Sequence, residues 1–327
     1  MDTSVIKTGT EGKAWGGGLD NPPLKASYGK MMMWFFLLSD ALTFAAFLVS
    51  YGFSRFKFVD SWPIADEVFN HFPFMHGKDM PMYYVALMTF ILIFSSVTMV
   101  LAVDAGHKMN RKKVVFYMGL TIIGGLAFVG SQAWEWKNFI SGTYGAVETK
   151  AGRILQFYDA EGHRVGLSDI AAESTQRESL HRNNGVWFER EAETLSTYTV
   201  EDVVNGFVAN ENLLVRIQKL DEKGHPIMLS REESITALNN AVRVVEGANL
   251  YRNEYGHTLF GNFFFFITGF HGTHVSIGIL LNIVIFFNIL LGTYDRRGHY
   301  EMVEKVGLYW HFVDLVWVFV FTFFYLV

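Results

Sequence analysis

Four side chains able to do chemistry lie in the two long apolar runs that end the chain. His271 and His274 are three residues apart, and so are His311 and Asp314. On a helix this spacing places both members of each pair on one face. Because a polar group in hydrocarbon is costly, imidazole and carboxyl groups at membrane depth indicate a functional site.

Two further carboxyl groups lie in apolar runs, Asp40 near the middle of the first and Glu135 at the outer end of the third. The residues alone leave two functions open. In one, histidines on two helices ligate a haem iron. In the other, the buried polar groups bond one another, ordered lipid or a partner subunit.

The haem hypothesis requires two imidazoles at matched depth. We expect His274 at mid-span and His311 about five residues from the cytoplasmic end of its helix, which separates them by several helical turns. A structural role is also open, in which the polar groups only hold helices together. Close packing would be permitted by three glycines near the histidines: Gly269, Gly272 and Gly278.

Composition places the chain in a membrane. Half of its 327 residues are hydrophobic and 31 are Phe, and the apolar residues gather in a few long blocks, as in membrane spans. Cys is absent, so the sequence offers no disulfide, thiolate metal site or redox Cys pair. The net charge of −5 is carried by residues 137–258, which indicates a solvated acidic block and argues against nucleic acid as a partner.

Hydropathy predicts five spans, at 31–53, 82–103, 114–136, 259–292 and 306–327. The predicted fold is an all-α integral membrane bundle of five transmembrane helices with an inserted extramembrane α+β domain. Its parts are a tail at 1–30, spans one to three within 31–136, the insertion at 137–258, and spans four and five within 259–327. Residues 1–30 lack the apolar core and cleavage site of a removable signal peptide.

Basic residues predict the orientation. They cluster between spans two and three and between spans four and five, on the same side as the N-terminal lysines. These loop residues are Lys108, Arg111, Lys112, Lys113, Arg296, Arg297 and Lys305. By the positive-inside rule that side is cytoplasmic, so we expect residues 54–81, the insertion and the C-terminus on the external face.

The insertion contains a faint repeat. RILQFYDAEGHRVGLSD at 153–169 aligns with VRIQKLDEKGHPIMLSR at 215–231, at an offset of 62 residues. Each copy predicts a β-hairpin around a D-x-x-G turn and then a helix capped by Ser168 or Ser230, the latter in a capping box with Glu233. The alternative is that such turns are common and the similarity is chance. The histidines of this block are scattered and expected at the surface rather than in a metal site: His163, His181 and His225.

Several segments resemble a known family. TGFHGTHVSIG at 268–278 and YWHFVDLVWVFVF at 309–321 are similar to two characteristic segments of subunit III of cytochrome c oxidase. YGKMMMWFFLLSDALTFAAFLVSYGF at 28–53 and SQAWEWKNF at 131–139 resemble two more, in the same order. The resemblance covers all five spans and points to a five-helix bacterial form with a large external insertion.

The resemblance implies a subunit without a redox centre of its own: no haem, copper or other metal is expected in this chain, and haem and copper would lie in partner subunits. Subunit III packs on the catalytic core, holds phospholipids in a cleft between its helices, and supports proton uptake and lasting turnover. By position, Asp40 matches the family's intramembrane carboxylate, which is normally Glu. The remaining matched positions are assigned to lipid binding or a buried polar network: Glu135, His271, His274, Asn288, His311 and Asp314.

Three features depart from the family pattern. Asp40 is one methylene shorter than the usual Glu, and Asn288 stands where many members have a basic residue near a lipid phosphate. The long form of the family has two further helices before these five, so the lipid cleft that they wall is either completed by a partner or open. The third departure is the acidic insertion, for which we expect a docked neighbour, either another respiratory complex or a basic cytochrome.

The sequence therefore predicts a non-catalytic subunit III of a proton-pumping haem-copper terminal oxidase in a bacterial inner membrane. Its expected partners are subunits I and II of the oxidase and phospholipids, with the N-terminus cytoplasmic and the C-terminus and 137–258 periplasmic. Two alternatives are a haem b electron-transfer subunit and a purely structural assembly or lipid-binding module.

Overall fold

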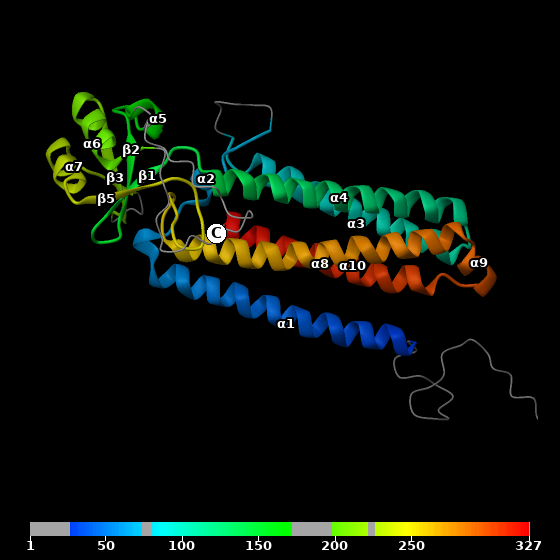
Figure 1. The fold of residues 1–327 in the computed structure, drawn as a ribbon. Helices are drawn as coiled ribbons and strands as arrows, with labels where there is room; N and C mark the ends of the chain where they lie inside the picture. Colours follow the sequence, from blue (N-terminus) through cyan, green and yellow to red (C-terminus); the bar gives the residue numbers. More distant parts are fainter. Residues whose placement is uncertain (1–26, 74–79, 172–197, 222–225, 327) are drawn as a thin grey trace, which may run out of the picture. The chain divides into compact units, whose positions relative to one another are not determined.

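The computed structural model describes residues 27–73, 80–171, 198–221 and 226–326. Five helices in this part of the chain are long and apolar enough to cross a membrane, which confirms the predicted number of spans. They are α1 (Tyr28–Lys57), α3 (Tyr83–His107), α4 (Arg111–Ser141), α8 (Thr258–Leu290) and α10 (Glu301–Phe321), the last continued by a π-helical turn at Thr322–Leu326 (Figure 1).

The fifth membrane helix is longer at its start than hydropathy predicts. It begins at Glu301 rather than at residue 306, because its first turn is held by ionic side chains. Glu301 accepts a hydrogen bond from Ser27 and lies 3.0 Å from Lys305 Nζ, while Glu304 lies 2.7 Å from Lys30 Nζ. Acidic residues are also favourable at a helix N-terminus. A prediction based on apolar runs alone therefore leaves out this charged first turn of the helix.

Short helices connect some of these spans. Helix η2 (Val59–Ser61) and helix α2 (Ala65–Val68) lie in the segment predicted as an external loop, and α9 (Thr293–Arg297) lies between α8 and α10. Phe69 follows α2 and packs on Tyr325, with ring centroids 4.5 Å apart. The segment after α1 therefore packs against the end of the chain.

The chain folds into two compact units. The first comprises residues 27–47 of the described chain with 89–129 and 270–319. Here glycines bring helices close together: a Cβ on Gly278 of α8 would lie 3.0 Å from the Trp310 ring of α10, and one on Gly125 of α4 would lie 2.6 Å from it. The indole N–H of Trp310 donates to Ser95 Oγ of α3 at 2.8 Å. Close packing at small residues and one buried hydrogen bond thus hold α3, α4, α8 and α10 against one another.

The second unit comprises residues 48–88, 130–269 and 320–326 of the described chain and contains a five-stranded antiparallel sheet. Its strands are β1 (Ala146–Thr149), β2 (Ile154–Tyr158), β3 (Leu214–Leu220), β4 (Pro226–Met228) and β5 (Ala241–Val245), in the order β4-β3-β2-β1-β5. This sheet and its helices confirm the predicted α+β insertion.

Helices α6 (Val200–Ala209) and α7 (Arg231–Leu238) lie on the same side of the sheet (Figure 1). Alternate residues Leu155 and Phe157 of β2 are buried with Val203 and Phe207, which are four apart on α6. Side chains two residues apart on a strand, or four apart on a helix, lie on one face of that element, so one face of β2 and one face of α6 form this core. Each of these side chains contributes roughly 1.5–3 kcal/mol by leaving water.

Both copies of the predicted repeat form hairpins, but only one helix cap is correct. After β2 the chain turns back so that Tyr158 bridges Arg164, and β3 pairs with β4. The second copy's turn, at 222–225, lies outside the described residues. Ser230 caps α7, and its capping box with Glu233 is confirmed. Ser168 lies inside α5 (Leu167–Ile170), whose N-cap is Gly166, so the predicted Ser168 cap is wrong.

The carboxylate of Glu254 ties the insertion to the ends of two membrane helices. The side chain is fully buried, and its oxygens accept the backbone N–H groups of Thr143, Tyr144 and Gly247. Arg164 Nη2 lies 3.9 Å away. The first two donors come from the link between α4 and β1, and the third comes from the loop that leads to α8. One buried carboxyl group thus fixes two separate segments of backbone.

Candidate functional site in the membrane helices

Asp40 of α1 and His274 of α8 form a pair inside the first unit. His274 Nε2 lies 3.3 Å from Asp40 Oδ2, and their side chains are 12% and 17% exposed. The other ring nitrogen, Nδ1, lies 2.9 Å from the Phe270 carbonyl oxygen. A carbonyl oxygen can only accept, so Nδ1 carries a hydrogen and donates. One further proton can then reside either on His274 Nε2 or on the Asp40 carboxyl.

His271 lies one helical turn before His274 and is almost fully buried, at 1% exposure. Its Nε2–H donates to the Val313 carbonyl oxygen of α10 at 3.0 Å. The ring packs against Phe128 and Trp317, with centroids 5.8 and 5.2 Å away. Its Nδ1 is buried and has no hydrogen-bond partner among the described residues. His271 therefore fixes α8 against α10 as a neutral, single-donor imidazole.

The expected difference in depth between the histidines is wrong. Tyr309 Oη donates to the His274 carbonyl oxygen at 3.0 Å, and His271 bonds to Val313. His311 lies between residues 309 and 313 on α10, so it is level with the other two histidines. The prediction failed because α10 begins five residues earlier than its apolar run, at Glu301 rather than at 306.

A haem does not fit between α8 and α10 despite this matched depth. The two helices are in direct contact there, through the His271 bond to Val313 and through Gly278, whose Cβ would meet Trp310 at 3.0 Å. His311 instead faces α3, where its Nδ1 lies 2.7 Å from Ser96 Oγ. The arrangement is that of packed helices joined by polar bonds.

His311 and Asp314 share a partner. Ser96 of α3 bonds His311 Nδ1 and also hydrogen-bonds the Asp314 carboxyl group. The predicted co-facial spacing of the two residues is therefore what allows one serine to bridge them. His311 also lines a pocket of about 280 Å³ with Glu304 and His107, whose side chains lie 3.7 Å apart.

Glu135 belongs to the second unit and is 5% exposed. Its Oε2 accepts hydrogen bonds from Gln132 Nε2 at 2.7 Å and from Tyr325 Oη at 3.0 Å. The bond to Gln132 is one helical turn back along α4, whereas Tyr325 comes from the end of the chain. Glu135 therefore joins these two segments, separately from the histidine contacts of the first unit.

Asn288, predicted near a lipid phosphate, lies in the last turn of α8. Its amide Nδ2 donates to the Val284 carbonyl oxygen of its own helix at 2.9 Å. Part of the amide's donor capacity is thus used within the helix. Asn288 and Glu135 lie apart from the Asp40–His274 pair in sequence and in their bonding partners.

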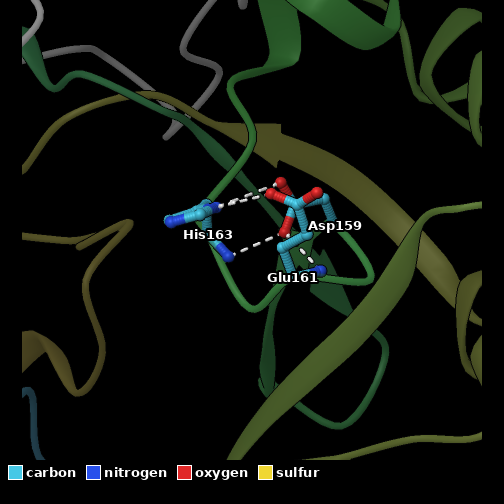
Figure 2. Close-up of side chains that lie close together, drawn as sticks. All are labelled: Asp159, Glu161 and His163. Atoms are coloured by element: carbon cyan, nitrogen blue, oxygen red, sulfur yellow. Dashed lines mark hydrogen bonds and ion pairs between the residues drawn. The ribbon is translucent and has the colours of Figure 1, made fainter.

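Three polar side chains cluster on the first hairpin of the insertion, at Asp159, Glu161 and His163 (Figure 2). Asp159 Oδ1 accepts the backbone N–H groups of Glu161 and His163 at 3.0 and 2.8 Å, and the His163 bond lowers the pKa of Asp159. His163 is 75% exposed and is the surface histidine that the sequence predicts. The cluster is explained by the turn, since Asp159 satisfies its backbone donors. His181 and His225 lie outside the described residues.

Sequence reasoning missed the partners of the predicted residues. Ser96 and Gln132 lie within apolar runs, where a hydroxyl or amide must find a hydrogen-bond partner. That requirement was the available signal, and IFSSVTMV at 93–100 carries it. Tyr325 gave no such signal, because a tyrosine near the end of a span is ordinary at a membrane interface.

Comparison with known proteins places the C-terminal part of the chain in a family. Residues 247–327 match the family model described as cytochrome c oxidase subunit III. Similar proteins include cytochrome c oxidase subunit 3 of Mycosarcoma maydis, 52% identical over 64 residues, which are 19% of this chain and 22% of that protein.

Two bacterial proteins are also similar. The probable cytochrome c oxidase subunit 3 of Rickettsia prowazekii is 40% identical over 79 residues (23% of this chain, 28% of the relative). The cytochrome c oxidase subunit 3 of Synechocystis is 46% identical over 69 residues (21% and 29%). The matched part thus spans less than a third of each of these relatives. The part of the chain that contains the His271, His274, His311 and Asp314 positions, residues 247–327, is thus the part that matches the cytochrome c oxidase subunit III family.

Proposed function

We propose that this chain is a non-catalytic subunit III of a proton-pumping haem-copper terminal oxidase in a bacterial inner membrane. Subunits I and II would be its partners and would hold the haem and copper, which supply the reduction of oxygen to water. The proposal is supported by the family match and by relatives named cytochrome c oxidase subunit 3, bacterial ones among them. This chain would support proton uptake and lasting turnover by the core.

The observation that carries this role is the Asp40–His274 pair. Since His274 Nδ1 is committed to the Phe270 carbonyl oxygen, Nε2 is the ring nitrogen that faces Asp40 Oδ2, 3.3 Å away. Such a pair gains and releases one proton with little rearrangement. The two side chains are 12% and 17% exposed, whereas the Asp40 Oδ2 atom itself is buried and has no hydrogen-bond partner among the described residues. These are the properties of a proton-holding site.

The test compares variants of Asp40 in the assembled oxidase, purified through a tag on this chain. Asp40→Asn keeps the shape and removes the exchangeable proton, whereas Asp40→Glu keeps a carboxyl group and introduces the residue that the family resemblance implies at this position. We expect the Asn variant to co-purify with the core but to lose oxygen consumption several-fold sooner during continuous turnover. The Glu variant should retain turnover. Equal turnover lifetimes for all three proteins would contradict the role.

Phospholipid binding is the second part of the proposal. Helix α1 has the smallest buried share of the five membrane helices, 17% against 28–44%, and large apolar side chains such as Trp34, Phe35 and Leu42 are exposed on it. We infer that lipid chains or a partner's helices cover this surface. The polar groups at Glu135, His271 and Asp314 would meanwhile hold the other helices at fixed spacing.

The insertion would dock a neighbour with a basic surface. Its support is the charge of residues 137–258, with 18 acidic and 13 basic residues, and the exposed carboxylates of Glu201, Glu211 and Glu232 on and beside α6 and α7. A triple Glu→Gln variant at these positions should weaken co-purification of a second respiratory complex or of a basic cytochrome in low salt. Deletion of 145–250 without change in subunit composition or turnover would refute docking.

A further inference from the structure

A polar pocket of about 520 Å³ lies beside the sheet, where two membrane helices end. It is lined by Asp60, three residues after the end of α1, and by Thr258, the first residue of α8. The end of β1 and the end of β3 supply the opposing residues Glu148 and Lys219. The two helices that flank it are candidate membrane spans, so the pocket is expected near the level of lipid headgroups.

Two basic side chains that line the pocket have no acidic partner among the described residues. Glu148 is already neutralised, since Arg252 Nη1 lies 3.3 Å and Arg243 Nε 3.6 Å from its Oε2. Arg153 and Lys219 line the same pocket, are exposed, and form no ion pair within the described part of the chain. A guanidinium and an ammonium group with free donors favour a phosphate oxygen. The pocket is thus locally basic although the insertion around it is acidic.

The mouth and wall of the pocket have the side chains of a membrane interface. Tyr251 lines it and is 57% exposed. His257 stacks on Phe58 with ring centroids 4.1 Å apart, and the Trp62 ring lies 6.1 Å from that of His257. Since His257 Nδ1 accepts the backbone N–H of Leu259, Nε2 carries the hydrogen and is a neutral donor. Aromatic rings with a polar edge are enriched where acyl chains meet headgroups.

We propose that this pocket binds the headgroup of a glycerophospholipid from the adjacent leaflet, with Arg153 and Lys219 on its phosphate and Tyr251 beside its glycerol. Asp60 forms no ion pair among the described residues and would contact an amine where the headgroup carries one. The lipid would be held by the insertion, outside the spanning helices. Its acyl chains would continue along the exposed Phe53 and Phe56 at the end of α1.

The test counts phospholipids retained by the full chain in its detergent-purified complex, by native mass spectrometry. The probes are phosphatidylethanolamine and phosphatidylglycerol, added to delipidated protein, with inorganic phosphate in a separate arm. The variants are Arg153→Gln/Lys219→Gln and, as a matched control, Lys150→Gln, an exposed lysine of the same sheet region that does not line the pocket. The double variant should bind one phospholipid fewer, with affinity for that lipid about 30-fold weaker, as expected for two cations near a membrane surface.

The control should retain the wild-type number of lipids. Equal lipid counts in the wild type and the double variant would overturn the proposal. So would phosphate that binds alone without any lipid, or loss of a co-purifying polypeptide in place of a lipid. If the double variant unfolds at a lower temperature than the wild type, the single variants Arg153→Gln and Lys219→Gln are used instead. Each removes one positive charge, and its lipid count is compared with that of the wild type in the same way.

Discussion

Two carboxylates in this molecule, Glu254 in the second unit and Asp40 in the first, have opposite surroundings. Glu254 is fully buried and accepts three backbone N–H groups, with Arg164 3.9 Å away. Asp40 is 17% exposed and faces one imidazole nitrogen at 3.3 Å. A buried carboxyl group whose oxygens accept several fixed backbone N–H groups organises the backbone around it. One that faces only an imidazole nitrogen is the group that we propose to hold an exchangeable proton.

The largest effect is expected for Glu254→Gln. The amide would turn an N–H donor toward at least one backbone N–H and leave Arg164 without its anion. Removing one partner of a buried charge typically costs about 3–5 kcal/mol, so we expect a large loss of stability. Thermal unfolding in detergent and protease sensitivity of the insertion would measure it. Glu211→Gln, at an exposed glutamate, is the control, and equal unfolding of both variants would show that Glu254 does not tie these segments.

A much smaller stability change is expected for Asp40→Asn. A partly exposed ion pair is worth up to about 1 kcal/mol, and the amide can still donate to His274 Nε2. Unfolding should therefore be close to that of the wild type, while turnover lifetime falls. If Asp40→Asn instead unfolded as readily as Glu254→Gln, Asp40 would be a structural carboxylate and the contrast between the two sites would fail.

The contrast also indicates what a sequence can predict here. Apolar runs predict the five spans because their length and composition follow from the thickness of the membrane. Asp40, His271 and His311 are recognisable because polar groups are costly at that depth. The Glu254 contacts could not be predicted, since a glutamate before a span looks like any interfacial charge until backbone N–H groups from two distant segments converge on it.

The same limit explains the two errors. The depth of His311 was misjudged because the first turn of α10 is stabilised by Lys30 and Ser27, which are distant in sequence. The cap at Ser168 was misassigned because a serine after a hairpin is a local signal, and α5 is only a single turn, Leu167–Ile170. The periodicity of apolar residues in a sequence predicts neither long-range ion pairs nor very short helices.

A pH effect is expected from His257, which lies just before α8. Burial lowers the pKa of His257 from its ordinary value near 6.5, so the unfolded chain takes up a proton at a higher pH than the folded chain. Stability is then present above the unfolded-state pKa and is lost as pH falls through it toward the folded-state pKa. His257→Gln should unfold with a flatter pH dependence between about pH 7 and about pH 5. An unchanged slope for His257→Gln would contradict the expectation.

A last contrast is between two serines at equivalent places in the repeat. Ser230 Oγ accepts the Glu233 N–H at 3.3 Å, and Glu233 Oε2 accepts the Ser230 N–H at 3.0 Å, so Ser230→Ala should lower stability by about 1 kcal/mol, as for other serine caps. Ser168 is not the cap of α5, whose N-cap is Gly166, and Ser168→Ala should leave stability almost unchanged. Chemical unfolding of both variants measures the difference. Equal losses of stability would mean that the helices of the two copies are capped alike. Unequal losses would show that the two hairpins are alike while the helices after them are not. The physical reason is that only α7 is long enough to leave several backbone N–H groups in need of a cap.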